Sequence, residues 1–298
     1  MPNAASFKIH VPARRQETSF EKVRHIEESN QRAMPMTAYS REVLPIESTA
    51  IVLPERRGNP RRATRSKKPA PVENRLLAVL PRKDRQHLLA NCQQVKLTFA
   101  EILCEPGERI RHVYFPVDGI ISLVIPVDSR ASLEVELVGN EGMVGVPLML
   151  GVNVSPLRVV VQGAGTALRM DAAAFRRELA LSLALRRNLH RYLYVLLIQL
   201  AQTAACNRFH VLDARLARWL LMTHDRAHAD DFHLTHEVLA QMLGVRRVGV
   251  TNAAGLLQKR KLVSYSRGNI TVLDRAGLED ASCGCYRVVK DAYHDILG

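Results

Sequence analysis

The chain has 298 residues, of which 47% are hydrophobic, so it is long enough to form two ordinary domains with apolar cores. Its 42 Lys and Arg residues outnumber 29 Asp and Glu residues, and the net charge of +13 makes nucleic acid the first partner to consider. No run approaches the roughly 20 uninterrupted apolar residues of a membrane span, and the N-terminus lacks the apolar core of a signal peptide. We therefore expect a cytoplasmic protein with no membrane partner.

The five cysteines are scattered, and their odd number argues against a disulfide framework. Only Cys283 and Cys285 lie close together. One intervening residue is fewer than zinc sites usually have, and no second ligand pair is evident in the sequence. We therefore predict neither a metal site nor a cofactor.

Residues 1–72 are rich in proline and in basic residues, and they show no sustained period of 2 or 3.6, which predicts a disordered basic tail. Within it, "RRGNPRRATRSKK" (56–68) has seven basic residues and no acidic one. This segment is either an anchor on nucleic-acid phosphates or a solvated linker, and the sequence leaves both interpretations open.

A folded domain is predicted over residues 73–180, beginning with apolar pairs at helical spacing. Short runs rich in Val, Ile, Tyr and Phe follow, separated by glycine and proline turn signals. The predicted strands are two runs within 109–127 around Pro116 to Gly119, then 132–138, 158–162 and 165–170. Many short strands without long helices between them favour an antiparallel β-roll or barrel.

At Asp171, a predicted N-cap, the pattern becomes helical, and a long helix is predicted over 181–206. Its apolar residues recur three and four apart: Leu185, Leu189, Tyr192, Leu196, Leu200 and Thr203, broadened by Leu193, Leu197 and Ala204. The helix either packs on its own β-roll alone or pairs with its twin in a homodimer. Its length favours the second interpretation, so we assign 181–212 as a dimerisation helix.

The stretch "LAQMLGVRRVGVTNAAGLLQ" (239–258) interrupts an apolar pattern with a glycine and resumes with two arginines. In a helix-turn-helix, a small residue at Ala240 lets two helices cross, Gly244 accepts the positive φ of the turn, and Val250 locks the second helix on the first. Thr235 is the predicted N-cap of the first helix. Residues 213–298 are therefore predicted to form a winged helix-turn-helix domain.

The second helix, starting near Arg246, would place its first turns in the major groove, and the strands flanking "SRGN" would form the wing. Paired arginines suit this position because arginine can bond O6 and N7 of guanine together. The predicted DNA-binding residues are Thr235, Arg246, Arg247, Gly249, Thr251, Asn252, Lys259, Lys261 and Arg267.

Over about residues 75–280, the chain resembles the Crp/Fnr family of bacterial transcription regulators. The stretches "VYFPVDGIISLV", "VGNEGMVGVPLMLG" and "LAQMLGVRRVGVTNAAGLLQKRKLV" carry the likeness. The resemblance implies an α+β fold with an N-terminal antiparallel β-roll of the cyclic-nucleotide-binding, jelly-roll type, a long dimerisation helix and a C-terminal winged helix-turn-helix. It also implies a homodimer that binds double-stranded DNA, works with RNA polymerase and senses a small-molecule effector.

The effector pocket departs from the family's cyclic-AMP pattern. The Gly-Glu pair that holds the ribose becomes Gly145-Val146, and the Arg-Ser or Arg-Ala pair that holds the phosphate becomes, loosely, Leu157-Arg158. Valine cannot accept a hydrogen bond from a ribose hydroxyl. We therefore expect a degenerate pocket, with Gly145, Val146 and Arg158 as its candidate residues, and an effector other than cyclic AMP.

Iron–sulfur sensing requires N-terminal cysteines, and none precedes Cys92. His112 and Cys104 are possible axial haem ligands, but both are better interpreted as structural residues. In the recognition helix, the family's Arg-Glu-x-x-x-Arg set becomes Arg247, Val248 and Asn252, which predicts a different operator because asparagine pairs with adenine rather than cytosine or guanine.

Two other functions compete with a regulator. One is a nonspecific nucleic-acid packaging protein, which the basic tail would suit. The other is a metal-dependent enzyme using "HDRAHADDFHLTH" (224–236), although this segment lacks an HExxH pattern and suits a solvated interdomain loop. No nucleophile with a nearby base stands out, so we predict that the protein is not an enzyme.

Overall fold

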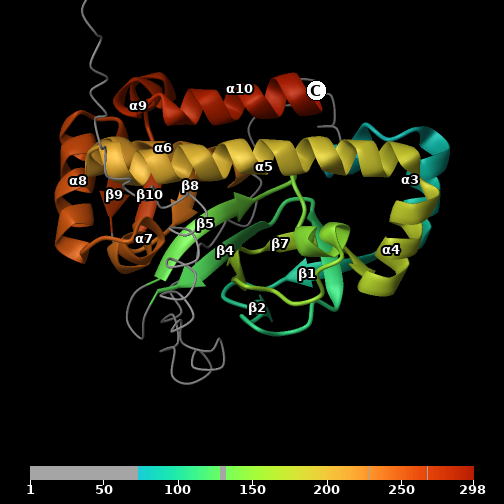
Figure 1. The fold of residues 1–298 in the computed structure, drawn as a ribbon. Coiled ribbons are helices and arrows are strands. Elements are labelled where there is room, and N and C mark those ends of the chain that lie inside the picture. Colours follow the sequence, from blue (N-terminus) through green and yellow to red (C-terminus); the bar gives the residue numbers. More distant parts are fainter. Residues whose placement is uncertain (1–72, 128–131, 228, 267) are drawn as a thin grey trace, which may run out of the picture. The chain divides into compact units, whose positions relative to one another are not determined.

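A computed structural model describes residues 73–127, 132–227, 229–266 and 268–298 (Figure 1). The tail predicted at 1–72, including the basic run at 56–68, and Arg267 lie outside these ranges. The described chain has the predicted α+β architecture: an antiparallel β-roll, a long helix and a C-terminal domain of short helices with a small sheet. None of its described helices combines the length and apolarity that a bilayer crossing requires.

Two antiparallel sheets form the β-roll, preceded by α2 (Arg75–Ala78) and α3 (Arg82–Ala90). One sheet has the order β1-β7-β3 and the other β2-β6-β4-β5. Their strands are β1 (Gln93–Leu97), β2 (Ile102–Cys104), β3 (His112–Pro116), β4 (Ile120–Pro126), β5 (Ser132–Val138), β6 (Arg158–Gly163) and β7 (Gly165–Asp171). The strands predicted from apolar runs are confirmed, whereas β1 and β2 were missed because they are short and partly polar.

Serine 182 divides the helical region at a different place from the one predicted. Asp171 caps α4 (Ala172–Leu181) as expected, since its carboxylate accepts the N–H groups of Ala173 and Ala174. Ser182 then adopts an extended conformation and caps α5 (Leu183–Phe209) by accepting the N–H of Leu185. The long helix predicted from about residue 181 therefore starts at Leu183.

The C-terminal domain contains more structure than the sequence patterns indicated. It consists of α6 (Leu212–Ala227), β8 (Asp231–His233), α7 (His236–Leu243), α8 (Arg247–Lys259), β9 (Val263–Ser266), β10 (Asn269–Val272), α9 (Arg275–Ala281) and α10 (Cys285–Leu297). The interdomain loop expected at 224–236 is wrong, because its start belongs to α6 and its middle forms β8, which pairs with β10. Helix α10 runs alongside α5 (Figure 1).

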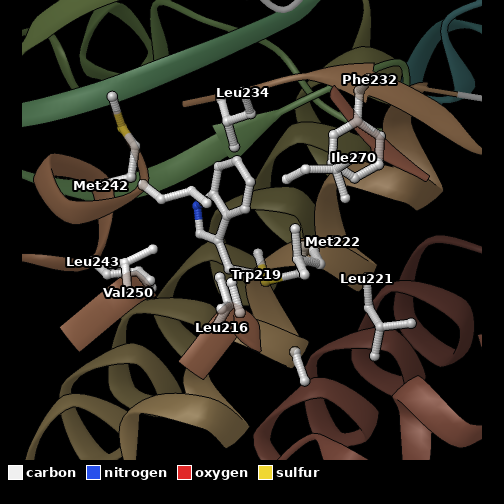
Figure 2. Packing of buried hydrophobic residues seen from close by; sticks show 14 of the residues in the cluster. Leu216, Trp219, Leu221, Met222, Phe232, Leu234, Met242, Leu243, Val250 and Ile270 are labelled. Carbon is white, nitrogen blue, oxygen red and sulfur yellow. The ribbon is translucent and has the colours of Figure 1, made fainter. Parts of the chain in front are cut away.

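Trp219 on α6 lies in the apolar core that the C-terminal domain shares with the β-roll (Figure 2). This core includes Val250 of α8 and Ile120 and Leu137 of the roll. Burying a large apolar side chain stabilises the fold by roughly 1.5 to 3 kcal/mol, so this shared core joins the β-roll and the C-terminal domain closely.

Candidate DNA-binding site and effector cavity

The predicted helix corner is present between α7 and α8. Gly244 has a φ of +63°, and the N–H of Val245 donates to the carbonyl of Ala240 at 2.9 Å. Ala240 and Val250 are both buried in the same core cluster. Because a residue with a Cβ is strained at this φ, glycine permits the sharp turn that sets the second helix across the first.

Thr235, predicted both as a cap and as a DNA contact, caps α7. Its Oγ1 accepts the N–H of Val238 at 3.3 Å, and the residue is half-buried. The hydroxyl therefore satisfies a backbone donor that the helix start leaves without a partner.

The first turns of α8 present a row of exposed side chains. Arg246, Arg247, Thr251 and Asn252 are all exposed, as predicted. Val248, which stands where the family's pattern has glutamate, is 64% exposed, and its methyl groups suit contact with a thymine methyl.

Gly249 does not belong to this exposed face. It is half-buried, and a Cβ built on it would lie 2.9 Å from Cδ2 of Leu212. Gly249 allows α8 to approach the start of α6 closely, and its role in DNA binding stays a prediction.

The contacts of Arg247 leave its guanidinium available to a ligand. Its side chain is 71% exposed, and its Nε lies 4.0 Å from the exposed carboxylate of Glu237, a separation at which screened surface pairs contribute little. Next to it, the Oγ1 of Thr251 donates to the Arg247 carbonyl at 3.1 Å and lies 3.0 Å from Nδ1 of His236. Burial, assisted by the charge of Arg247, lowers the pKa of His236, which stacks on Tyr265.

Basic residues continue beyond the C-terminal end of α8. Lys259, Arg260 and Lys261 are all exposed, and Lys261 turns the chain with a φ of +58°. Strands β9 and β10 follow as the predicted wing hairpin. This basic run suits nonspecific contact with a phosphate backbone.

The β-roll contains a cavity of about 420 Å³. Apolar residues such as Leu123 and Val159 line it together with charged ones, Glu108, Arg109 and Arg111. Cys104 and His112 also face it, and burial lowers the pKa of His112, which favours the neutral imidazole. The cavity therefore offers a mixed apolar and polar surface to a small molecule.

The candidate effector residues are only partly brought together. Gly145 lines the cavity with a φ of +104°, and a Cβ built on it would lie 2.7 Å from Cγ1 of Val113, so glycine suits this tight turn. Val146 and Arg158 are not among the residues that line the cavity. Arg158 is buried, and its Nε donates to Glu105 at 2.9 Å, so its role as a ligand-facing arginine stays a prediction.

Comparisons with known proteins agree with this geometry. Residues 214–281 match the family model described as a Crp-like helix-turn-helix domain. This segment is therefore a Crp-like helix-turn-helix domain.

Solved structures show the same fold at low sequence identity. A Crp/Fnr-family regulator from Eubacterium rectale matches with a TM-score of 0.56 and 17% identity over 69% of this chain and 96% of its own. The c-di-GMP-responsive regulator CLP of Xanthomonas campestris gives 0.55 and 15% over 64% and 99%. FixK2 of Bradyrhizobium japonicum gives 0.53 and 14% over 65% and 98%. Among curated protein sequences, none matches the chain.

Among the described residues of 224–236, the histidines and aspartates do not gather into one metal-binding group. Nε2 of His224 lies 2.8 Å from Asp230, His233 bonds Asn269, and His236 bonds Thr251. Within the described ranges, the group of side chains that could hold a metal ion lies elsewhere and is formed by cysteines and one other histidine.

A buried carboxyl group connects the roll to the helix-turn-helix domain. Glu134 on β5 accepts the indole N–H of Trp219 at 2.8 Å and the hydroxyl of Ser122 at 2.7 Å. The helix corner also touches this strand, because a Cβ on Gly244 would lie 3.0 Å from Leu133. Strand β5 therefore contacts both α6 and the turn that precedes α8.

Burial raises the pKa of Glu134 to about 7, although Ser122 and Trp219 donate to it and Arg226 and Arg218 lie near. In the unfolded chain the carboxyl ionises near 4.5, so the folded state holds the proton more tightly. Its contribution to stability is complete below about pH 4.5 and is lost as the pH rises through about 7. Each unit of upward shift corresponds to about 1.4 kcal/mol.

We expect Glu134→Gln to remove this pH dependence, because glutamine can still accept from Trp219 but does not ionise. Urea unfolding at several pH values between 4.5 and 8 should show a free energy of unfolding that falls with pH less steeply in the variant than in the unaltered chain. Asp118→Asn, at an exposed carboxylate in the roll, is the control. An unchanged slope in Glu134→Gln would contradict the assignment.

Proposed function

We propose that the protein is a homodimeric, sequence-specific DNA-binding regulator whose β-roll senses a small molecule other than cyclic AMP. The single observation that supports recognition of a DNA sequence is the exposure of the first turns of α8. There, the side chains of Arg246, Arg247, Thr251 and Asn252 face outward from a buried helix corner. Residues of this kind reach base edges when a recognition helix enters the major groove.

Recognition would be divided among three side chains. Arg247 can bond O6 and N7 of guanine together, Asn252 can bond N6 and N7 of adenine, and Val248 can contact a thymine methyl. Lys259 and Lys261 would bind phosphates and contribute affinity without selecting a sequence. The basic tail predicted before residue 73 would add to this nonspecific affinity for DNA.

Dimerisation is supported by an exposed stripe on α5. The residues spaced alternately four and three apart on this stripe are all exposed: Leu183, Arg187, His190, Tyr194, Leu197, Ala201, Ala204 and Arg208. Five of them are apolar or aromatic. Spacing of this kind is the a and d pattern of a coiled-coil seam.

The stripe lies apart from the face of α5 that packs within its own chain. Leu185, Leu189, Tyr192 and Leu196 are buried in the roll core, whereas Leu197 and Tyr194 are each 57% exposed. The sequence pattern merged these two faces into one. A second copy of α5 is the partner that fits this stripe. The stripe is continuous along the helix, so the same surface of a second copy can pack against it in a parallel or antiparallel pair.

A dimer of this design would place two α8 helices in successive major grooves, with half-sites about 34 to 36 Å apart. The DNA-bound dimer would then contact RNA polymerase at a promoter, as the Crp/Fnr resemblance implies. The effector would enter the roll cavity and act through β5 and Trp219, which join that cavity's sheet to the DNA-binding domain.

Selection of bound fragments from random double-stranded DNA tests this function. We expect enrichment of a palindromic sequence, preferred over random DNA by at least about 10³-fold at physiological salt. Candidate metabolites added to the selection should change the yield of that sequence if the roll senses them. A protein that packages nucleic acid would yield no consensus and would bind all fragments alike, which would refute the proposal.

A further inference from the structure

Three cysteines and a histidine meet where α5 ends. The cluster consists of Cys206, His210, Cys283 and Cys285, and one ligand atom from each lies within 4.8 Å of all the others. The three cysteines are buried and unlinked, and His210 is exposed. Neither the family nor the structural comparisons assign a role to this group.

Two distant pieces of the chain build the cluster. Cys206 lies in the last turn of α5, and His210 is its C-cap residue, whose N–H donates to the carbonyl of Cys206 at 3.1 Å. Cys283 lies in the link between α9 and α10, and Cys285 is the first residue of α10. The sequence analysis found only this second pair, because the first is 77 residues away from it in sequence.

The distances within the cluster fit one tetrahedral ion. Sγ of Cys206 lies 3.4 Å from Sγ of Cys283, and Sγ of Cys285 lies 3.5 Å from Nδ1 of His210. Zinc binds sulfur at about 2.3 Å and imidazole nitrogen at about 2.0 to 2.1 Å, so the edges of its tetrahedron measure about 3.5 to 3.8 Å. A disulfide would require about 2.05 Å between the sulfurs.

The surroundings supply positive charge. Arg215 and Arg218 of α6 line the same small cavity as Cys206, and the Nε of each is buried with no hydrogen-bond partner among the described residues. A zinc ion held by three thiolates and a neutral histidine has a net charge of −1. These two arginines can balance that charge, which a purely apolar pocket could not do.

We propose that Cys206, His210, Cys283 and Cys285 bind one Zn²⁺ ion as a closed structural site. Each cysteine gives its thiol proton to solvent on binding, and the four protein ligands leave no open position for chemistry. The ion would tie the end of α5 to the α9–α10 link, and so fix the C-terminal helices against the long helix. This site stands whether or not the DNA-binding proposal holds.

Metal analysis of the untagged full-length chain, purified under reducing conditions without chelator, tests the proposal. We expect one equivalent of zinc per chain. After chelation, Co²⁺ should restore the visible absorption of a tetrahedral thiolate site, and Zn²⁺ should displace it. Bound zinc should raise the unfolding temperature relative to the chelated chain, because an ion that binds only the folded state stabilises it.

Two ligand variants and one control make the test specific. Cys285→Ser should abolish the cobalt spectrum, and His210→Ala, at an exposed position, should weaken zinc binding without affecting the chelated chain's unfolding temperature. Loss of an outer-shell partner already costs about 10- to 100-fold in affinity, so removal of a direct ligand should cost at least as much. Cys92→Ser, outside the cluster, should behave as the unaltered chain.

The proposal is overturned if the reduced, unaltered chain binds neither ion. It is also overturned if binding is equal in Cys285→Ser and Cys92→Ser, which would place the metal elsewhere. Formation of a Cys206–Cys283 disulfide on mild oxidation, with no metal binding by the reduced chain, would instead identify the cluster as a thiol pair.

Discussion

Leu197→Arg is expected to convert the proposed dimer into a monomer. Leu197 lies in the middle of the exposed stripe of α5, so in a dimer both copies would face each other across the seam. Burial of two leucines contributes roughly 3 to 6 kcal/mol, and two facing arginines would add repulsion. The dimer dissociation constant should rise by more than about 100-fold, which sedimentation at micromolar concentration would detect.

The same variant should lose most of its affinity for a palindromic operator. A monomer binds only one half-site. It therefore loses the gain in affinity, roughly 10² to 10⁴-fold, that comes from linking two DNA-binding domains in one dimer. Its affinity for an isolated half-site should not change, because α8 is untouched. Val152→Arg, which adds the same charge at an exposed apolar residue of the roll, is the control. If Leu197→Arg remains dimeric, the seam on α5 is refuted.

Arg247→Ala is expected to relax sequence preference at one base pair in each half-site. A bidentate contact with guanine contributes about 1 to 3 kcal/mol of discrimination, so affinity for the preferred operator should fall about 5- to 150-fold. Binding to random DNA should fall much less. Arg247→Lys should recover little, because lysine cannot form the paired bonds of the guanidinium group.

Lys259→Ala provides the contrast, because Lys259 is assigned to phosphates rather than bases. Its loss should weaken binding to every sequence by a similar factor and reduce the slope of affinity against salt by about one unit. Titration of specific and random duplexes at several salt concentrations separates the two effects. Equal losses on specific and random DNA in both variants would contradict the division of roles.

The helix corner could be predicted from the spacing of residues in the sequence. An alanine, a glycine and a valine at the spacing of Ala240, Gly244 and Val250 predicted two crossed helices, and the φ of Gly244 and the burial of the other two confirm them. Exposure on α8 was predictable for the same reason, since helical periodicity assigns each residue a face. Periodicity could not predict that Gly249 lets α8 approach Leu212 of α6 closely, because that contact joins two helices.

The residues that line the roll cavity and the separate faces of α5 could not be predicted from local sequence pattern. Alternating apolar residues predicted the strands, but which side chains face a cavity depends on how two sheets pair. Arg158 illustrates this, because its partner Glu105 lies on a different part of the roll and draws it into an ion pair. On α5, an apolar residue looks the same in sequence whether it packs on its own roll or stays exposed for a partner.

The sequence by itself therefore determined the class of most elements of the roll, the long helix, the helix corner and the positive charge of α8. These depend on interactions between residues close in the chain, where spacing alone sets geometry. Only the tertiary structure decided that Glu134 is buried against Trp219, that Arg158 is paired, and that Cys206 and His210 meet Cys283 and Cys285. Those contacts join residues tens of positions apart, and no local spacing contains the distances between them.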